Sequence, residues 1–540
     1  MLTLADGTKR QKSFIALGSQ IEKGVARYKF LLLTLFSLLY LTATCYRASR
    51  KAFWFDELFT IYISRLQDVQ SIWFALKQGV DFNPPVFYLL TKAGEKLVGS
   101  GHLGSRLPEV IGFGILCLCL FRFVSFRTTV LAGLVAMVFP MAASAYWYAY
   151  EARPYGIVAG CCGLALVCWQ GATTDEGKTR IWWLIGLGGA LSVAVLNHAY
   201  GTLIFIPVLI GELTRSFNRR RIDLPLCLTL LLASTACAAL VPLAQVASLP
   251  EMAGNHGDAS FTSIDRALVR ISDSYKWHLE KTSFALTIAV IFIFMNRSLS
   301  SRASTRNVSS YPDPPSHEIA VLWGLMGLPI FAAILSLLTK SSFFDRYSIS
   351  LVGGIAGLLG LALARMPAHA AIMLTMLCIQ IAIDNMDYIR SSAMMVPSTQ
   401  VRLSTHIPQL QKQYEIMEAF PEKNIPIALL DNLEFATTLY YAPENLASRM
   451  IYLMRRNSDS LGLIYKRLAT CCGARGTTSY AAGMEALAPR FLIYGPVRSS
   501  YRLDDLLDIG YRVTIINTTA GYFLGIVDRP IPLQRSLRSK

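Results

Sequence analysis

Charged residues are scarce in this sequence. They make up only 16% of the 540 residues, whereas hydrophobic residues make up 53%. Soluble globular proteins carry about 25% charged residues, and the mean hydropathy here is +0.42. This composition argues against a soluble enzyme, and it excludes intrinsic disorder because disordered chains are poor in apolar residues. It predicts a polytopic membrane protein with room for a domain exposed to water.

Residue spacings typical of zinc sites are also lacking. The sequence has no CxxC pair, and zinc sites usually need such spacing or a Cys/His equivalent. Most of the 11 cysteines lie inside apolar runs, where a free cysteine behaves as a small hydrophobic residue. We therefore assign no metal site and no certain cofactor. A divalent metal stays open, because His256 and His278 both lie in the segment 248–283.

The basic residues are placed as in a membrane protein. The net charge of +16 comes from 51 basic and 35 acidic residues. Lys and Arg accumulate in cytoplasmic loops of membrane proteins, so this excess does not indicate nucleic-acid binding. We count about eleven apolar runs near the ~20 residues that a spanning helix needs. They start near Phe30, Val110, Thr129, Tyr155, Ile181, Gly201, Leu224, Phe284, Ile319, Tyr347 and Ala370.

The loops between these runs alternate between loops rich in Lys and Arg and loops without such an excess. The positive-inside rule then predicts a cytoplasmic N-terminus over residues 1–29 and a transmembrane domain over 30–388. The first run lacks a small-residue cleavage site, so we expect it to be a retained span. Outer-loop helices are expected at 47–108 and 248–283. The second is either a surface helix that gates substrate entry or an interfacial segment with no catalytic part, and both interpretations stay open. The remaining 389–540 would then lie outside, which in a bacterium means an inner-membrane protein with this domain in the periplasm.

Residues 389–540 have the composition of a soluble domain. Short apolar, strand-like runs such as "IPIALL" and "RFLIYG" alternate there with helix-like stretches. Strands that alternate with helices predict a small α/β domain. This domain contains neither GxGxxG nor GxxxxGK[ST], so we assign it no nucleotide site.

Polar residues gather in segments that the predicted topology places on the outer side. Each segment alone is also compatible with a helix cap or an interfacial anchor. Together they supply a carboxylate base, cations for an anion and aromatic platforms, which suits a lipid-phosphate substrate whose head group lies at the interface. The candidates are Asp56 and Glu57 in "FWFDELFTIY", Arg106 in "SRLPEVIGF", Glu151, Arg153 and Tyr155 in "YWYAYEARPYG", His198 and Tyr200 in "LNHAYG", and Arg346 and Tyr347 in "DRY".

The order "FDELFT … DFNPPVFYLL … SRLP … YAYEARPYG … NHAYG … DRY" resembles the polyprenyl-phosphate-sugar glycosyltransferases of the membrane-embedded GT-C class. This group includes protein O-mannosyltransferases, lipid A aminoarabinose transferases and galacturonosyltransferases of the lipopolysaccharide core. The resemblance covers about residues 30–365. One departure is Asn83-Pro84-Pro85, where the family usually has His-Pro-Pro.

The resemblance implies transfer of a single sugar, with inversion, from a polyprenyl-phosphate carrier to a glycan, lipid or protein acceptor at the outer face. It implies that Asp56 is the catalytic acid of the family's first loop, with Glu57 beside it, and that Arg346 meets the donor phosphate. In our mechanism a carboxylate removes the proton of the acceptor hydroxyl. Asp56 is the first choice for this base, and Glu57 competes with it. Arg106 or Arg153 would assist Arg346.

Three other functions stay open at this point. A multi-span transporter is disfavoured because the spans hold few ionisable residues near mid-membrane, where transport paths usually need them. An oligosaccharide-ligase type transferase would need a wider acceptor groove. A scaffold with an outer α/β domain is the third alternative.

Overall fold

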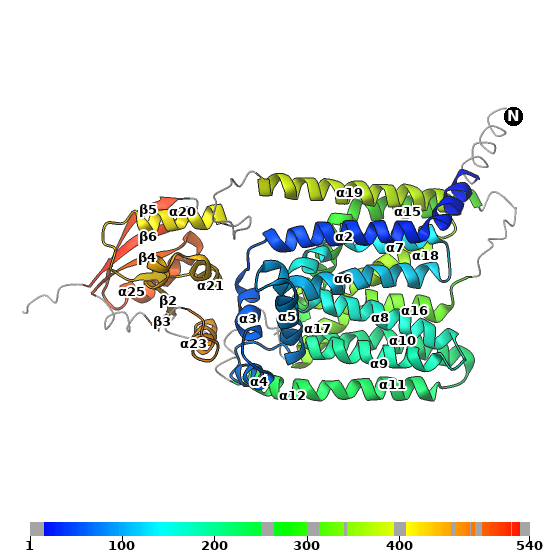
Figure 1. Cartoon of the computed structure of the whole chain (residues 1–540), viewed down its shortest axis with the longest axis horizontal. Coiled ribbons are helices and arrows are strands. Elements are labelled where there is room, and N and C mark those ends of the chain that lie inside the picture. Colours follow the sequence, from blue (N-terminus) through cyan, green and yellow to red (C-terminus); the bar gives the residue numbers. More distant parts are fainter. Residues whose placement is uncertain are drawn as a thin grey trace, which may run out of the picture. The chain divides into compact units, whose positions relative to one another are not determined.

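The computed structural model describes residues 16–249, 264–300, 313–339, 343–393, 407–454, 460–475, 477–480, 489–519 and 521–529. The chain divides into two compact units (Figure 1). The first, called here the helical unit, comprises residues 1–50, 83–241 and 259–396. The second, called the sheet unit, comprises 51–82, 242–258 and 397–540.

The helical unit is built from helices that run nearly parallel to one another, as α2, α6, α8, α9 and α11 do in Figure 1. Within it α6 contacts α8, α8 contacts α9, and α7 contacts both α18 and α19. Its elements are α2 (Lys29–Arg50), α5 (Pro85–Val98), α6 (His102–Ser125), α7 (Val130–Ala142), η1 (Ser144–Tyr150), α8 (Tyr155–Thr174), α9 (Arg180–Asn197), η2 (Ala199–Ile204), α10 (Phe205–Arg219), α11 (Leu224–Ser234), η3 (Thr235–Leu240), α14 (Ile264–Leu279), η5 (Glu280–Thr282), α15 (Ser283–Ser300), α16 (Ser316–Met326), α17 (Leu328–Thr339), η6 (Asp345–Ser348), α18 (Leu351–Leu363) and α19 (Pro367–Ala393). The helix α12 (Val241–Ala247) follows η3 directly.

A helix occurs at each of the predicted apolar runs, but not every one of these helices is long enough by itself to be a span. Among the described residues, 6 helices are long and apolar enough to cross a membrane, or up to 8 if each of two bent pairs is one span. The helix α18 is apolar but has 13 residues. At 1.5 Å per residue it is about 20 Å long, shorter than the ~30 Å hydrocarbon core. The mostly helical fold with apolar spans is therefore confirmed, whereas the count of about eleven is not.

Small residues let α6 and α8 approach closely. A Cβ atom added at Gly160 would lie 2.3 Å from the carbonyl oxygen of Gly112, and one added at Gly112 would lie 2.7 Å from that of Gly156. Apolar helices gain no hydrophobic free energy by meeting each other in lipid, so close packing of this kind holds them together. These three glycines therefore set the distance between the two helices.

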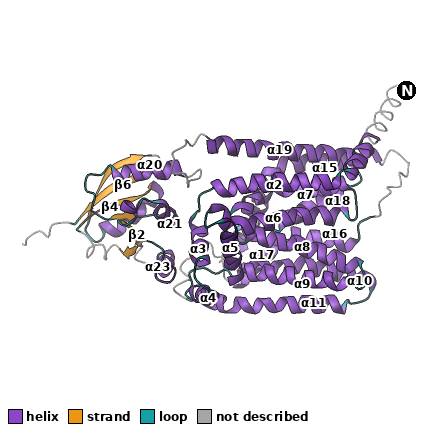
Figure 2. Ribbon diagram, viewed as in Figure 1, coloured by secondary structure: helices purple, strands orange, loops and turns teal. Residues whose placement is uncertain are grey.

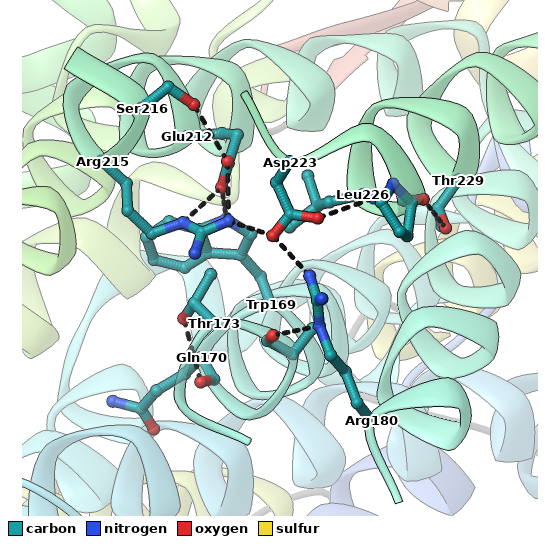
Figure 3. Close-up of polar contacts among 12 residues, drawn as sticks. Trp169, Gln170, Thr173, Arg180, Glu212, Arg215, Ser216, Asp223, Leu226 and Thr229 are labelled. Carbon is teal, nitrogen blue, oxygen red and sulfur yellow. Dashed lines mark hydrogen bonds and ion pairs between the residues drawn. The ribbon is translucent and has the colours of Figure 1, made fainter. Parts of the chain in front are cut away.

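Charged side chains join four helices at the end of the bundle that carries the basic loops (Figure 3). The Arg215 guanidinium on α10 donates to both Glu212 oxygens, at 2.9 and 2.8 Å, and also pairs with Asp223. Asp223 pairs in turn with Arg180 at the start of α9. Trp169 of α8 donates its indole N–H to Glu212 at 3.3 Å. Because each buried charge has a partner of opposite sign, the cluster can stay out of water.

The sheet unit contains a six-stranded sheet in the order β3-β2-β1-β4-β6-β5. The strands β1 to β4 are parallel to one another, and β6 runs antiparallel to β4 and to β5. Figure 2 shows these strands beside the helices of the same unit. The elements are α3 (Phe55–Ser64), α4 (Val69–Lys77), α20 (Ile407–Glu418), β1 (Ile427–Leu429), α21 (Asn432–Tyr441), α22 (Glu444–Ala447), β2 (Met450–Met454), α23 (Ser460–Cys472), β3 (Thr477–Tyr480), β4 (Arg490–Pro496), η7 (Val497–Leu503), α25 (Asp504–Leu507), β5 (Arg512–Thr519) and β6 (Tyr522–Asp528). The α/β character expected for this region is confirmed.

Residues 51–82 pack against the C-terminal part of the chain. The Phe53 N–H donates to the Tyr441 hydroxyl at 2.8 Å. The Phe59 ring stacks on Tyr465 with centroids 5.6 Å apart, and α3 contacts both α21 and α23. The segment that carries Asp56 is thus part of the sheet unit, which no feature of the sequence indicated.

We expect Gly160→Ala to destabilise the helical unit, because the new methyl group meets backbone atoms of α6 that cannot rotate away. Overpacking of this kind costs about 1–3 kcal/mol. Thermal unfolding in detergent can be followed with a thiol-reactive fluorogenic dye, since Cys161 and Cys162 are buried and free in the folded protein. Gly189→Ala is the matched control, because a Cβ there meets nothing within 4 Å. Equal midpoints for the two variants would contradict the role of Gly160.

Candidate active site

The loop between α7 and α8 carries two buried charged residues. The chain bends by 74° between α7 and η1, and this change of direction leads into "EARPYG". The N–H of Arg153 donates to the Glu151 carbonyl at 2.7 Å, and that of Tyr155 donates to the Arg153 carbonyl at 2.8 Å. Glu151 and Arg153 are both buried. Successive tight turns therefore hold these side chains at the N-terminal end of α8.

Glu109 on α6 anchors this loop, and the sequence analysis missed it. Its Oε2 atom accepts the N–H of Ile157 at 2.9 Å and also interacts with the N–H of Gly156. The first N–H groups of a helix have no partner within the helix, and a carboxylate satisfies them well. Glu109 is buried. An acidic residue directly after Pro108, at the start of the apolar run, was the signal that could have revealed it.

An aromatic cluster, defined here as Tyr155, His198, Tyr200 and Tyr347, assembles from three separate segments. The Tyr200 and Tyr347 rings stack with centroids 4.2 Å apart. The His198 ring lies 5.3 Å from both Tyr155 and Tyr347. His198 ends α9, and its Nδ1 atom accepts the N–H of Tyr200 at 3.2 Å. Three of the predicted polar segments thus meet at one place.

Arg346 lies against the aromatic cluster. Its guanidinium carbon is 4.6 Å from the ring centroid of Phe344, 5.8 Å from that of Tyr347 and 5.9 Å from that of Tyr155. A cation over an aromatic face is attracted by the ring electrons. Arg346 is only half-buried, so the arrangement combines a planar cation with aromatic faces. Such a group can hold a phosphate and an adjoining sugar ring.

The helix α14 packs against η6, the segment that carries Arg346. His278 is fully buried, and its Nε2 atom lies 3.4 Å from the Ser348 hydroxyl. Ser348 also exchanges a hydrogen bond with Ser274 at 2.8 Å. Burial lowers the pKa of His278 to about 3, so the imidazole is neutral near pH 7. The gating role expected for 248–283 stays a prediction, and His256 lies outside the described residues.

The other predicted residues occupy different places. Arg106 is fully buried and donates to the Ala48 carbonyl at 2.7 Å, near the end of α2. Asp56 and Glu57 lie in the first turn of α3, in the sheet unit. Glu57 is fully buried, and its Oε2 atom accepts the N–H of Trp54 at 3.2 Å. Asp56 is half-buried. Glu57 therefore caps its own helix.

No group of three or more His, Cys, Asp or Glu side chains in the described parts of the chain could hold a metal ion.

We expect the helical unit to become less stable as the pH is lowered, because of His278. The unfolded chain protonates this residue below about pH 6.5, whereas the folded protein resists protonation until about pH 3. The unfolded state binds more protons in that window, so stability decreases as the pH decreases. His278→Gln should flatten the pH dependence of the thermal midpoint between about pH 7 and 5. Ser274→Ala keeps the titrating group and should retain the slope. Parallel curves for wild type and His278→Gln would contradict this.

No family model matches the sequence, and no curated protein matches it either. Solved structures of ArnT are similar to it. ArnT from Cupriavidus metallidurans bound to undecaprenyl phosphate aligns with a TM-score of 0.51 at 13% identity, over 92% of this chain and 97% of that chain. ArnT from the same organism in the apo state aligns with a TM-score of 0.42 at 12% identity, over 93% and 98% of the two chains. The first alignment shows that this chain has the fold of ArnT, a GT-C glycosyltransferase, as the order of its motifs predicted.

Proposed function

We propose that this protein is a membrane glycosyltransferase that moves a single sugar from a polyprenyl-phosphate carrier to an acceptor, with inversion. The observation that carries the proposal is the cluster of Arg346 with Tyr155, His198, Tyr200 and Tyr347, in a chain whose fold is that of ArnT. The ArnT structure holds undecaprenyl phosphate, and we extend that ligand class to this chain. The distribution of Lys and Arg supports an inner-membrane location with the acceptor on the periplasmic face.

The reaction replaces a phosphate oxygen by an acceptor oxygen at C1 of the sugar. The acceptor hydroxyl forms the new C–O bond from the face opposite the phosphate, which inverts the configuration. The bond between C1 and the phosphate oxygen breaks, and its electron pair stays with the lipid phosphate. A hydroxyl is a weak nucleophile at neutral pH, so a base must take its proton. We assign this base to Asp56.

Local geometry favours Asp56 over its neighbour. The Glu57 carboxylate is buried and occupied by the N–H of Trp54, whereas Asp56 is half-buried. Glu57 then has a structural task, because it satisfies a backbone group at the start of α3.

The departing phosphate needs positive charge directed at it, and it needs no acid because it is already a stable anion. We assign this contact to Arg346, whose planar guanidinium can donate two parallel hydrogen bonds. The rings of Tyr155, Tyr200 and Tyr347 offer stacking faces for the sugar. Among the other cations Arg153 is the better assistant, since Arg106 already donates to Ala48. Glu151 and His198 complete the proposed lining.

Asp56→Asn should lower sugar transfer by at least about a hundredfold, because a positioned general base contributes on that scale. Donor binding should persist. The assay uses purified protein and a radiolabelled polyprenyl-phosphate sugar, and Glu57→Gln serves as the matched control with a smaller loss. Near-normal turnover by Asp56→Asn in a folded protein would show that the base is another residue. A wild-type protein that neither binds nor turns over the donor would favour a transporter or a scaffold.

Arg346→Lys should reduce turnover by about a hundredfold or more, because lysine keeps the charge but cannot reproduce a bidentate contact with the leaving phosphate. Binding of undecaprenyl phosphate should weaken in parallel. Arg390→Lys at the exposed end of α19 is the control and should behave as wild type. Unchanged donor binding and turnover in Arg346→Lys would remove Arg346 from the proposed site.

A further inference from the structure

The sheet of the C-terminal region has a topological switch point between β1 and β4. The chain winds outward from β1 through β2 to β3, and then returns to place β4 on the other side of β1. In open α/β sheets, ligands bind beyond the carboxyl ends of the strands at such a point, because successive connections leave on opposite sides there. Asp431 follows β1, and Arg498 and Ser499 follow β4. Polar side chains are therefore present at this edge.

These side chains form an ordered array. Asp431 caps α21 by accepting the N–H groups of Leu433 and Glu434 at 2.9 and 3.0 Å. Its other oxygen accepts the Ser499 hydroxyl at 3.0 Å and lies 3.5 Å from Arg498. Arg498 is also 2.9 Å from Glu434 Oε1. Hydrogen bonds thus fix the carboxylates, while the Arg498 side chain stays 64% exposed.

Two tyrosines and a glutamine lie beside the array. Tyr522 donates its hydroxyl to Glu434 Oε1 at 2.9 Å, and its ring stacks on Tyr494 with centroids 5.7 Å apart and planes 4° from parallel. Gln413 of α20 interacts with the Tyr522 hydroxyl. The Tyr494 hydroxyl is close enough to Glu434, Tyr522 and Tyr414 to interact with them electrostatically. The stacked rings place the Tyr494 side chain beside this group.

Two polar atoms of the group have no hydrogen-bond partner in the described part of the chain. They are the Tyr494 hydroxyl and Gln413 Oε1, on residues that are only 4% and 7% exposed. Buried polar atoms in folded proteins nearly always have a partner, because losing the hydrogen bonds to water is costly. The Tyr494 hydroxyl can donate and accept a hydrogen bond, and Gln413 Oε1 can accept one. Together these atoms suit a ligand that carries several hydroxyl groups.

The charges narrow the class of ligand. The array holds two carboxylates and one guanidinium, and the next cation along η7, Arg502, already donates to the Tyr452 hydroxyl at 2.9 Å. Two carboxylates and one guanidinium give the array no net positive charge. A phosphate or a uronate would be repelled or unpaired here. A neutral sugar offers hydroxyl groups for the carboxylates and a C–H face for tyrosine.

We propose that Asp431, Glu434, Arg498, Tyr494, Tyr522 and Gln413 form a binding site for a neutral sugar ring at the carboxyl edge of the sheet. The site would recognise the glycan part of the acceptor, a role that rests on the proposed glycosyltransferase function. The Tyr494 hydroxyl and Gln413 would bind ring hydroxyl groups, and Glu434 and Arg498 would bind the hydroxyl groups that stay nearer to solvent.

The test uses the full-length protein in detergent and saturation-transfer NMR with the methyl glycosides of galactose, glucose and mannose. We expect a response to at least one glycoside. Tyr494→Phe should weaken this binding about three- to tenfold, because it removes one hydrogen bond and keeps the ring. Tyr511→Phe makes the same chemical change on the opposite face of the same sheet, where Tyr511 packs on Phe491, and should bind as wild type.

Two results would overturn the site. One is the absence of any glycoside response in the wild-type protein. The other is equal binding by Tyr494→Phe and wild type. A stronger response to glucose 6-phosphate than to methyl glucoside would also refute the assignment to a neutral sugar.

A turnover assay separates this site from the proposed catalytic function. Tyr494→Phe should raise the KM for the acceptor about three- to tenfold and leave the KM for the donor unchanged. A raised KM for the donor instead would show that the site serves the carrier-linked sugar. Glycoside binding that Tyr494→Phe weakens, in a protein without donor turnover, would retain the sugar site and reject the glycosyltransferase function.

Discussion

The close contact between α6 and α8 is the constraint on which the candidate site depends. Glycines bring the two backbones together, and Glu109 of α6 binds the first N–H groups of α8. In a membrane these polar groups have no water to hydrogen-bond with, so the bond between the carboxylate and the helix N-terminus stabilises the contact. This contact fixes the loop that ends at Tyr155. From there the Tyr155 ring reaches His198 and Tyr347, which places the aromatic cluster.

The two neighbouring carboxylates of α3 differ in their surroundings, although they are adjacent in sequence and chemically alike. Glu57 turns back to the N–H of Trp54 and stabilises the helix start, whereas Asp56, one position earlier, keeps a half-buried side chain. The same helix packs against α21 and α23. The segment with the proposed base is thus held by the unit that also carries the proposed sugar site.

Much of the architecture could be predicted from the sequence, because hydrophobicity and its period are local properties. Each predicted apolar run contains a helix, and residues 389–540 contain the expected strands and helices. The convergence of Tyr155, His198 and Arg346 followed from a common side of the predicted topology. The count of about eleven spans stays a prediction, since 6 helices of the described chain, or up to 8 with the two bent pairs, are long and apolar enough to cross a membrane. Glu109 was overlooked because it lies at the start of an apolar run and its partners are backbone groups of another helix.

The sequence by itself determined the membrane-spanning helical class, the α/β character of the C-terminal region and the polar segments that carry candidate chemistry, since each is written in residues close together in the chain. Only the tertiary structure decided that residues 51–82 belong with the C-terminal sheet and that β4 lies beside β1. It also stacked Tyr494 on Tyr522, whose hydroxyl donates to Glu434. Such contacts join residues far apart in sequence, and they depend on the packing of whole elements, which no local pattern of side chains specifies.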